Sequence, residues 1–186
     1  IGHKVDILIN NAEVHRTHGI SSRRGTEIAR AEMEINYLGL LRLAQAFGPA
    51  LQGRAADGSA HAVAWVNMLS VFALSNFPAQ GTYSASKAAA LSLAQCLRSD
   101  MLSHGIRVLN VFPGPIDDEW NQAMPPPKLT GAGGGRALGE ALRAGLADAV
   151  IAGGVDSICQ FTIAGCINPA NWSCITPPIH FLKIIN

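Results

Sequence analysis

The sequence is poor in charge and in aromatic side chains, and both shortages exclude classes of partner. Charged residues make up 15% of the 186 residues, aromatic residues make up 6%, and the formal net charge is +1. So small an excess charge gives no electrostatic reason to expect nucleic acid or an anionic membrane as a partner. Apolar residues make up 48%, which is enough for a hydrophobic core, and the length is typical of one domain.

The sequence also lacks the signals of metal sites, disulfide frameworks, membrane spans and secretion. The four cysteines form no C-x-x-C pair, and no histidine pair stands at zinc spacing beside them. Cys96 falls inside an apolar helical pattern, so we expect it to be a small core residue. No apolar run reaches the length of a membrane span, and the N-terminus has no basic stretch followed by an apolar one. These absences predict a protein of the reducing cytoplasm, with no metal.

Strand-like and helix-like segments alternate along residues 1–154. Short apolar runs predict buried strands at 5–10, 62–69, 105–112 and 148–154, and apolar residues at helical spacing predict helices at 26–52, 82–103 and 136–146. Thr26 is expected to cap the first helix. This alternation is typical of an α/β fold with a parallel sheet and crossover helices. Residues 155–186 show no clear periodicity, and a divergent tail, a flexible segment and a shifted reading frame all stay open for them.

Three distinctive stretches stand where predicted strands end. The segment 10–13 follows the first strand, Ser70 follows the second, and the pair 113–114 follows the third. In open parallel sheets, ligands bind beyond the carboxyl ends of the strands. The sequence therefore predicts a binding crevice to which all three stretches contribute.

Tyr83 and Lys87 stand four residues apart in a predicted helix and therefore share one face of it. A tyrosine ordinarily titrates near about 10, and a fixed positive charge beside it favours the phenolate and lowers its pKa. The pair could thus make a phenol useful in proton transfer, while Ser70 could offer its hydroxyl to a substrate oxygen. Tyr-x-x-x-Lys also arises by chance in many helices, so the pair alone is weak evidence of catalysis.

Five short motifs resemble, in order, those of the short-chain dehydrogenase/reductase family, whose members use NAD or NADP on a Rossmann-type sheet. They are "INNAE" (9–13), "NYLG" (36–39), "VNMLS" (66–70), "YSASK" (83–87) and "FPGPI" (112–116). Ser70 stands thirteen residues before Tyr83, which is the family's spacing. The resemblance covers residues 3 to 150.

The resemblance implies a catalytic role for four residues. Tyr83 is implied as the proton donor in carbonyl reduction or the acceptor in alcohol oxidation, and Ser70 as the group that orients the substrate carbonyl. Lys87 is implied to lower the pKa of the tyrosine and to bind the nicotinamide ribose. Asn36 is implied to organise a proton relay through its helix and water, although it could also be an ordinary polar helix position.

The resemblance also implies a cofactor, NAD or NADP, and partners. Besides Tyr83 and Lys87, the residues implied to bind the cofactor are Asn10, Asn11, Ala12, Pro113, Gly114 and Ile116, the last through its backbone near the carboxamide. The implied substrate is a small carbonyl compound or alcohol. Family members commonly pair through two long helices, here 26–52 and 82–103, so a homodimer or homotetramer is implied.

Three features depart from the family's pattern. The glycine-rich turn that receives the pyrophosphate is absent, and the sequence starts at the strand before "NNA", so we expect the fold to lack the family's first βαβ portion. Glu13 stands where glycine is expected and adds bulk and negative charge beside a cofactor that carries two phosphates. We expect weakened cofactor binding, which an outward rotation of Glu13 could limit. Asp118 stands where threonine is expected.

Two functions follow from this balance. The first is an NAD(P)-dependent oxidoreductase that interconverts a carbonyl and a secondary alcohol with Tyr83 as acid and base. The second is a truncated, catalytically impaired relative that keeps the fold and serves as an interaction or dimerisation module. A lyase or epimerase of the wider superfamily shares Tyr-x-x-x-Lys, but the "NNA" and "PGPI" surroundings fit it less well.

Overall fold

The computed structural model describes residues 5, 7–16, 20, 21, 23, 25–56, 64–117, 128, 130–133, 136, 149 and 150. The chain divides into two compact units, residues 1–110 and 111–186. The second unit includes the short strand β4 (Ala149–Val150), which falls inside the strand predicted at 148–154. The predicted domain boundary at 154 and nearly all of the helix predicted at 136–146 lie outside the described residues.

The sheet of the first unit contains the strands β1 (Ile7–Asn10), β2 (Ala64–Met68) and β3 (Arg107–Val111), in that order. β1 and β2 are parallel, with Leu8 opposite Trp65. Between β1 and β2 the chain forms one helical stretch of three parts: α1 (Gly25–Glu32), the π-helical segment η2 (Met33–Leu38) and α2 (Gly39–Ala56). Between β2 and β3 lie two 3-10 turns, η3 (Val71–Ala73) and η4 (Pro78–Gln80), and then the helix α3 (Gly81–Leu102). The predicted α/β fold with a parallel sheet and crossover helices is confirmed.

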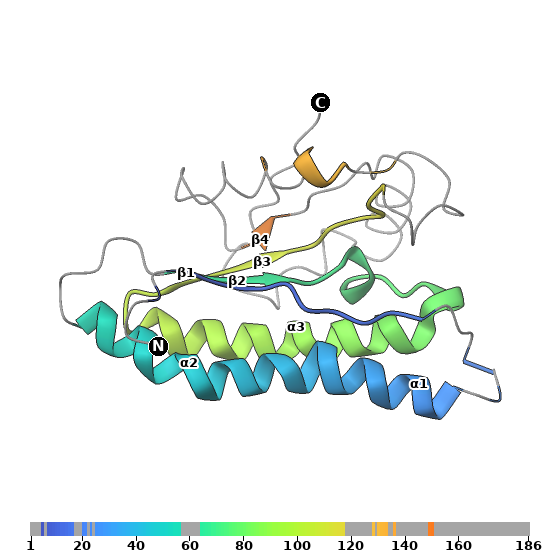
Figure 1. Cartoon of the computed structure of the whole chain (residues 1–186), viewed down its shortest axis with the longest axis horizontal. Coiled ribbons are helices and arrows are strands. Elements are labelled where there is room, and N and C mark those ends of the chain that lie inside the picture. Colours follow the sequence, from blue (N-terminus) through green and yellow to red (C-terminus); the bar gives the residue numbers. More distant parts are fainter. Residues whose placement is uncertain are drawn as a thin grey trace, which may run out of the picture. The chain divides into compact units, whose positions relative to one another are not determined.

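The helices α1, α2 and α3 lie on one face of the strands β1, β2 and β3, with α2 beside α3 (Figure 1). Crossovers between neighbouring parallel strands are nearly always right-handed, so strands laid down in chain order send successive helices to the same face. The helical stretch begins at Gly25, which leaves Thr26 inside the first turn. The prediction that Thr26 caps this helix was therefore wrong.

The first strand is less buried than its apolar sequence predicts. Leu8 is 8% exposed, whereas Ile7 and Ile9 are 45% and 53% exposed. Successive side chains of a strand point to opposite faces, and in β1, at the edge of the sheet, only the face that carries Leu8 is covered. The neighbouring strand β2 is buried from Ala64 to Asn67, as predicted.

Cys96 is exposed, so its prediction as a core residue was wrong. The buried stripe of α3 consists of Ala90, Ala94, Leu97 and Met101, which recur at helical spacing. Cys96 lies one position before Leu97, about 100° around the helix, and so faces away from that stripe. It lines an outer groove between α2 and α3 instead.

The end of α3 is fixed by a glycine. Gly105 has a φ of 71°, a conformation that side chains with a Cβ rarely adopt. The backbone N–H of Ile106 then donates to the carbonyl of Met101 at 3.2 Å, and both side chains are buried. This arrangement ends the helix and turns the chain into β3.

Candidate active site

Ser70, Tyr83 and Lys87 come together where β2 ends and α3 begins. Ser70 lies two residues after β2, and its Oγ accepts a hydrogen bond of 3.2 Å from the backbone N–H of Phe72, which caps η3. Tyr83 and Lys87 lie in the first two turns of α3, which packs against η3, and are only 5% and 2% exposed. The structure thus gathers these three predicted residues in one buried place.

Lys87 makes its contacts on the side of α3 that faces β2. Its Nζ donates to the carbonyl oxygen of Met68 at 3.1 Å and lies 5.6 Å from the centre of the Tyr83 ring. The same atom lies 2.8 Å from Oε2 of Glu13, which forms an ion pair with it. The ammonium is therefore already neutralised by a carboxylate of the chain itself.

Glu13 also holds the tyrosine. The Tyr83 hydroxyl donates to Oε2 of Glu13 at 3.0 Å, so one carboxylate oxygen accepts from both Tyr83 and Lys87. The other oxygen, Oε1, lies 3.5 Å from Nδ1 of His15, whose ring meets the Tyr83 ring edge-on. Glu13 thus points into the site, and the outward rotation considered from the sequence is not the arrangement found.

The pKa of Tyr83 is raised well above its ordinary value, and burial of the phenol is the main cause. The negative charge of Glu13 raises this pKa further, while a hydrogen bond with the Ser70 side chain acts in the opposite direction. The lowered pKa implied by the resemblance is not found, because the phenol is desolvated and the Glu13 carboxylate lies beside it.

Asn36 anchors the loop that carries Glu13. It lies in η2, and its Oδ1 accepts from the backbone N–H of Val14 at 2.9 Å while its Nδ2 donates to the carbonyl of Val14 at 2.8 Å. Nδ2 also donates to Oγ of Ser86 at 2.9 Å, and Ser86 donates to the carbonyl of Tyr83 at 2.8 Å. The side chain therefore ties the loop to α3 beside the tyrosine, and its implied part in a proton relay stays a prediction.

Three side chains of this site were missed in the sequence. His15 contacts both Glu13 and Tyr83, and Ser86 links Asn36 to α3. Glu32 is fully buried, and its Oε1 accepts from the backbone N–H of Arg16 at 2.9 Å. Glu32 stands one helical turn before Asn36 and Ser86 three residues after Tyr83, so helical spacing was a signal that could have found them.

The residues implied to bind the cofactor are placed only in part. Asn10 ends β1, and Asn11 and Ala12 are exposed in the loop that leads to Glu13. Pro113, Gly114 and Ile116 follow β3, are half-buried and belong to the second unit. The cofactor-binding role of all six stays a prediction.

Two absences hold for the part of the chain that the structure describes. No helix in it is long and apolar enough to cross a membrane. No group of three or more His, Cys, Asp or Glu side chains in it is placed to hold a metal ion.

The chain is thus an α/β protein with a buried tyrosine and lysine one turn apart at the start of α3, beside a serine that lies two residues after β2. The family model for short chain dehydrogenases matches residues 2–128. The chain belongs to the short-chain dehydrogenase family.

Relatives and solved structures agree with this assignment. Dehydrogenase/reductase SDR family member 7B of Mus musculus is 36% identical over 112 residues, which are 60% of this chain and 32% of the mouse protein. A short chain dehydrogenase from Burkholderia cenocepacia J2315, solved in complex with NADP, has a TM-score of 0.76 and 36% identity over 95% of this chain and 70% of that one. A gluconate 5-dehydrogenase from the same organism, solved with NADP and tartrate, has a TM-score of 0.57 and 27% identity over 64% and 44%. The chain thus spans about a third of the length of the mouse relative.

Proposed function

We propose that this protein is an NAD(P)-dependent oxidoreductase that interconverts a carbonyl and a secondary alcohol, with Tyr83 as acid and base. The observation that carries the proposal is the meeting of Ser70, Tyr83 and Lys87 in one buried place at the end of β2. Family membership and the NADP complexes among similar structures support the choice of cofactor.

The side chains of Ser70, Tyr83 and Lys87 can donate the hydrogen bonds that the proposed reaction needs. A phenol, a hydroxyl and an ammonium can donate to a carbonyl oxygen and to the hydroxyls of a ribose. Glu13 already accepts from two of the three, so the fit requires its carboxylate to leave Tyr83 and Lys87. Asn10, Asn11, Ala12, Pro113, Gly114 and Ile116 are the further residues that we propose to line the nucleotide.

The protein's own groups move and hold the proton. When bound, the nicotinamide supplies or receives the hydride. In reduction, Ser70 orients the substrate carbonyl and Tyr83 gives its hydroxyl proton to the carbonyl oxygen as that oxygen gains negative charge. Lys87 then stabilises the phenolate that remains, since opposite charges at short range favour the ionised form. In oxidation, the phenolate of Tyr83 takes the proton back from the alcohol.

Cofactor titration tests the proposal. NADH and NADPH are added to the purified protein while nucleotide fluorescence or calorimetric heat is followed, and saturable binding of either nucleotide is expected. Absence of binding at millimolar nucleotide would refute the proposal for this chain.

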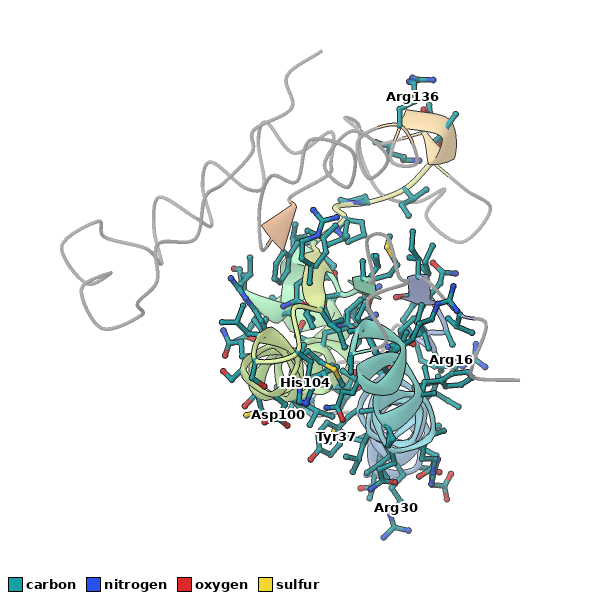
Figure 2. The ribbon with its side chains drawn as sticks, turned by 90° about the vertical axis from the view of Figure 1, so that its left-hand side faces the viewer. Arg16, Arg30, Tyr37, Asp100, His104 and Arg136 are labelled. Atoms are coloured by element: carbon teal, nitrogen blue, oxygen red, sulfur yellow. The ribbon has the colours of Figure 1, made fainter. Side chains whose placement is uncertain are left out.

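Substitution of the tyrosine tests its role. We expect Tyr83→Phe to abolish turnover while cofactor affinity changes little, because the ring remains and only the hydroxyl is lost. Tyr37→Phe is the matched control, since Tyr37 lies on the side of the helices turned away from the strands (Figure 2). Loss of turnover and of affinity together in Tyr83→Phe would mean that Tyr83 is structural.

The second candidate is a catalytically impaired relative that acts as an interaction or dimerisation module. It is favoured by the contacts of Glu13, which occupy the donors of the proposed site. We further propose that two copies pair through α2 and α3, supported by the groove between these helices and by the exposed Cys96 within it.

A cytoplasmic location is proposed from the lack of paired cysteine motifs, and cell fractionation tests it.

A further inference from the structure

We infer that Glu13 is an internal ligand of the site, which any hydroxyl-bearing ligand of Tyr83 and Lys87 must displace. The inference rests on the proposed function for the identity of that ligand, a nicotinamide nucleotide. Its basis is that Oε2 of Glu13 accepts from the Tyr83 hydroxyl at 3.0 Å and lies 2.8 Å from Nζ of Lys87.

These contacts use the donors that the site needs. A phenol has one O–H to donate, and in Tyr83 it is directed at Glu13. An ammonium has three, and in Lys87 one is directed at the Met68 carbonyl and one at Glu13. With Glu13 in place, the Tyr83 proton is not available to a substrate oxygen and at most one Lys87 donor is available to a ribose.

Of the three groups, the carboxylate is the one that can move. Lys87 and Tyr83 are 2% and 5% exposed and are held on a helix, whereas the Glu13 side chain is 38% exposed. The backbone on the C-terminal side of Glu13 is fixed, because Asn36 bonds both polar backbone groups of Val14. A rotation of the Glu13 side chain toward solvent, with the loop kept in place, is therefore the simplest way to open the site.

The charge of Glu13 adds a second effect to its contacts. A nucleotide cofactor is anionic, and a carboxylate in the site repels it as well as competing with it for Lys87. The contacts of Glu13 place a carboxylate against an ammonium and a phenol, whereas a ribose hydroxyl brings no negative charge to Lys87, so displacement of the carboxylate by the ribose gives up the ion pair. Glu13→Gly removes both the contacts and the charge, and Glu13→Gln keeps a side chain of similar shape without the charge.

The affinity test compares NADPH binding to the wild-type chain, Glu13→Gly, Glu13→Gln and the control Glu27→Gln. Glu27 is an exposed carboxylate in the first turn of α1, so its loss changes the net charge equally. We expect Glu13→Gly to bind NADPH at least about tenfold more tightly than the wild type, which corresponds to about 1.4 kcal/mol. The NADPH affinity of Glu13→Gln should lie between those of Glu13→Gly and the wild type, and that of Glu27→Gln should equal the wild type. Equal affinities of Glu13→Gly and the wild type would overturn the inference.

Ionisation of Tyr83 gives a readout without any cofactor. The sequence has two tyrosines, so in a Tyr37→Phe background the ultraviolet absorbance of tyrosinate reports Tyr83 alone. The titratable groups around this phenol are Glu13 and His15 of the loop, Glu32 of α1 and Lys87 of α3. Since the charge of Glu13 raises the pKa of Tyr83, Glu13→Gly and Glu13→Gln should shift its ionisation to lower pH, and Glu27→Gln should not.

The two readouts separate the inference from the proposed function. If no variant binds NADPH, the proposed function fails for this chain, while a shifted Tyr83 titration still shows that Glu13 holds the tyrosine. If the titration is the same with and without Glu13, the inference is wrong whether or not NADPH binds. Circular dichroism of each variant confirms that the fold is kept.

Discussion

Replacement of Asn36 by alanine should destabilise the first unit markedly. The buried side chain makes three hydrogen bonds, two to the backbone of Val14 and one to Ser86, at 2.8 to 2.9 Å. A hydrogen bond contributes about 1 kcal/mol on average, and an unpaired buried group costs about 1–3 kcal/mol. We therefore expect Asn36→Ala to lower the free energy of unfolding by about 3 kcal/mol, as the sum of three such bonds.

Urea unfolding followed by circular dichroism measures this loss. The transition midpoint should fall while its slope stays the same, because the surface exposed on unfolding is little changed. Arg30→Ala is the control: Arg30 projects from α1 into solvent (Figure 2), so its loss should change stability by no more than about 0.5 kcal/mol. A loss below about 1 kcal/mol in Asn36→Ala would refute the reasoning that this side chain fixes the loop to α3.

Three other predictions follow from buried or exposed side chains. The pKa of Tyr83 is raised in the folded state, so the unfolded chain releases the phenol proton at lower pH than the folded one. The contribution of Tyr83 to the free energy of unfolding should therefore be complete below about pH 10 and be lost as the pH rises further. Urea midpoints from about pH 9 to 11 should show this loss in the wild type and less of it in Tyr83→Phe. Trp65→Phe removes the 2.7 Å hydrogen bond from the indole N–H to Asn67 Oδ1, and should lower the free energy of unfolding by about 1–3 kcal/mol; an unchanged urea midpoint would contradict it. If two copies pair through α2 and α3, Cys96→Arg should give a monomer in sedimentation while Ala46→Arg, outside the groove, should not; a dimer in both variants would place the interface elsewhere.

The sequence by itself determined the order of the elements and the spacing of the central pair. Apolar periodicity located the first two helical stretches to within a few residues, since one buried face repeats every 3.6 residues whatever its partner. The motif "YSASK" placed Tyr83 and Lys87 one turn apart, which depends on helical geometry alone.

The tertiary structure decided what surrounds that pair. Glu13 is seventy residues from Tyr83 in the sequence, and its contact with the tyrosine depends on the packing of the loop after β1 against α3. The exposure of Ile7, Ile9 and Cys96 was likewise set by the position of an element at an edge or outer face, which local pattern does not encode. The rise in the pKa of Tyr83 also depends on tertiary packing, because burial of the phenol and the neighbouring charge of Glu13 exist only once distant segments have packed together.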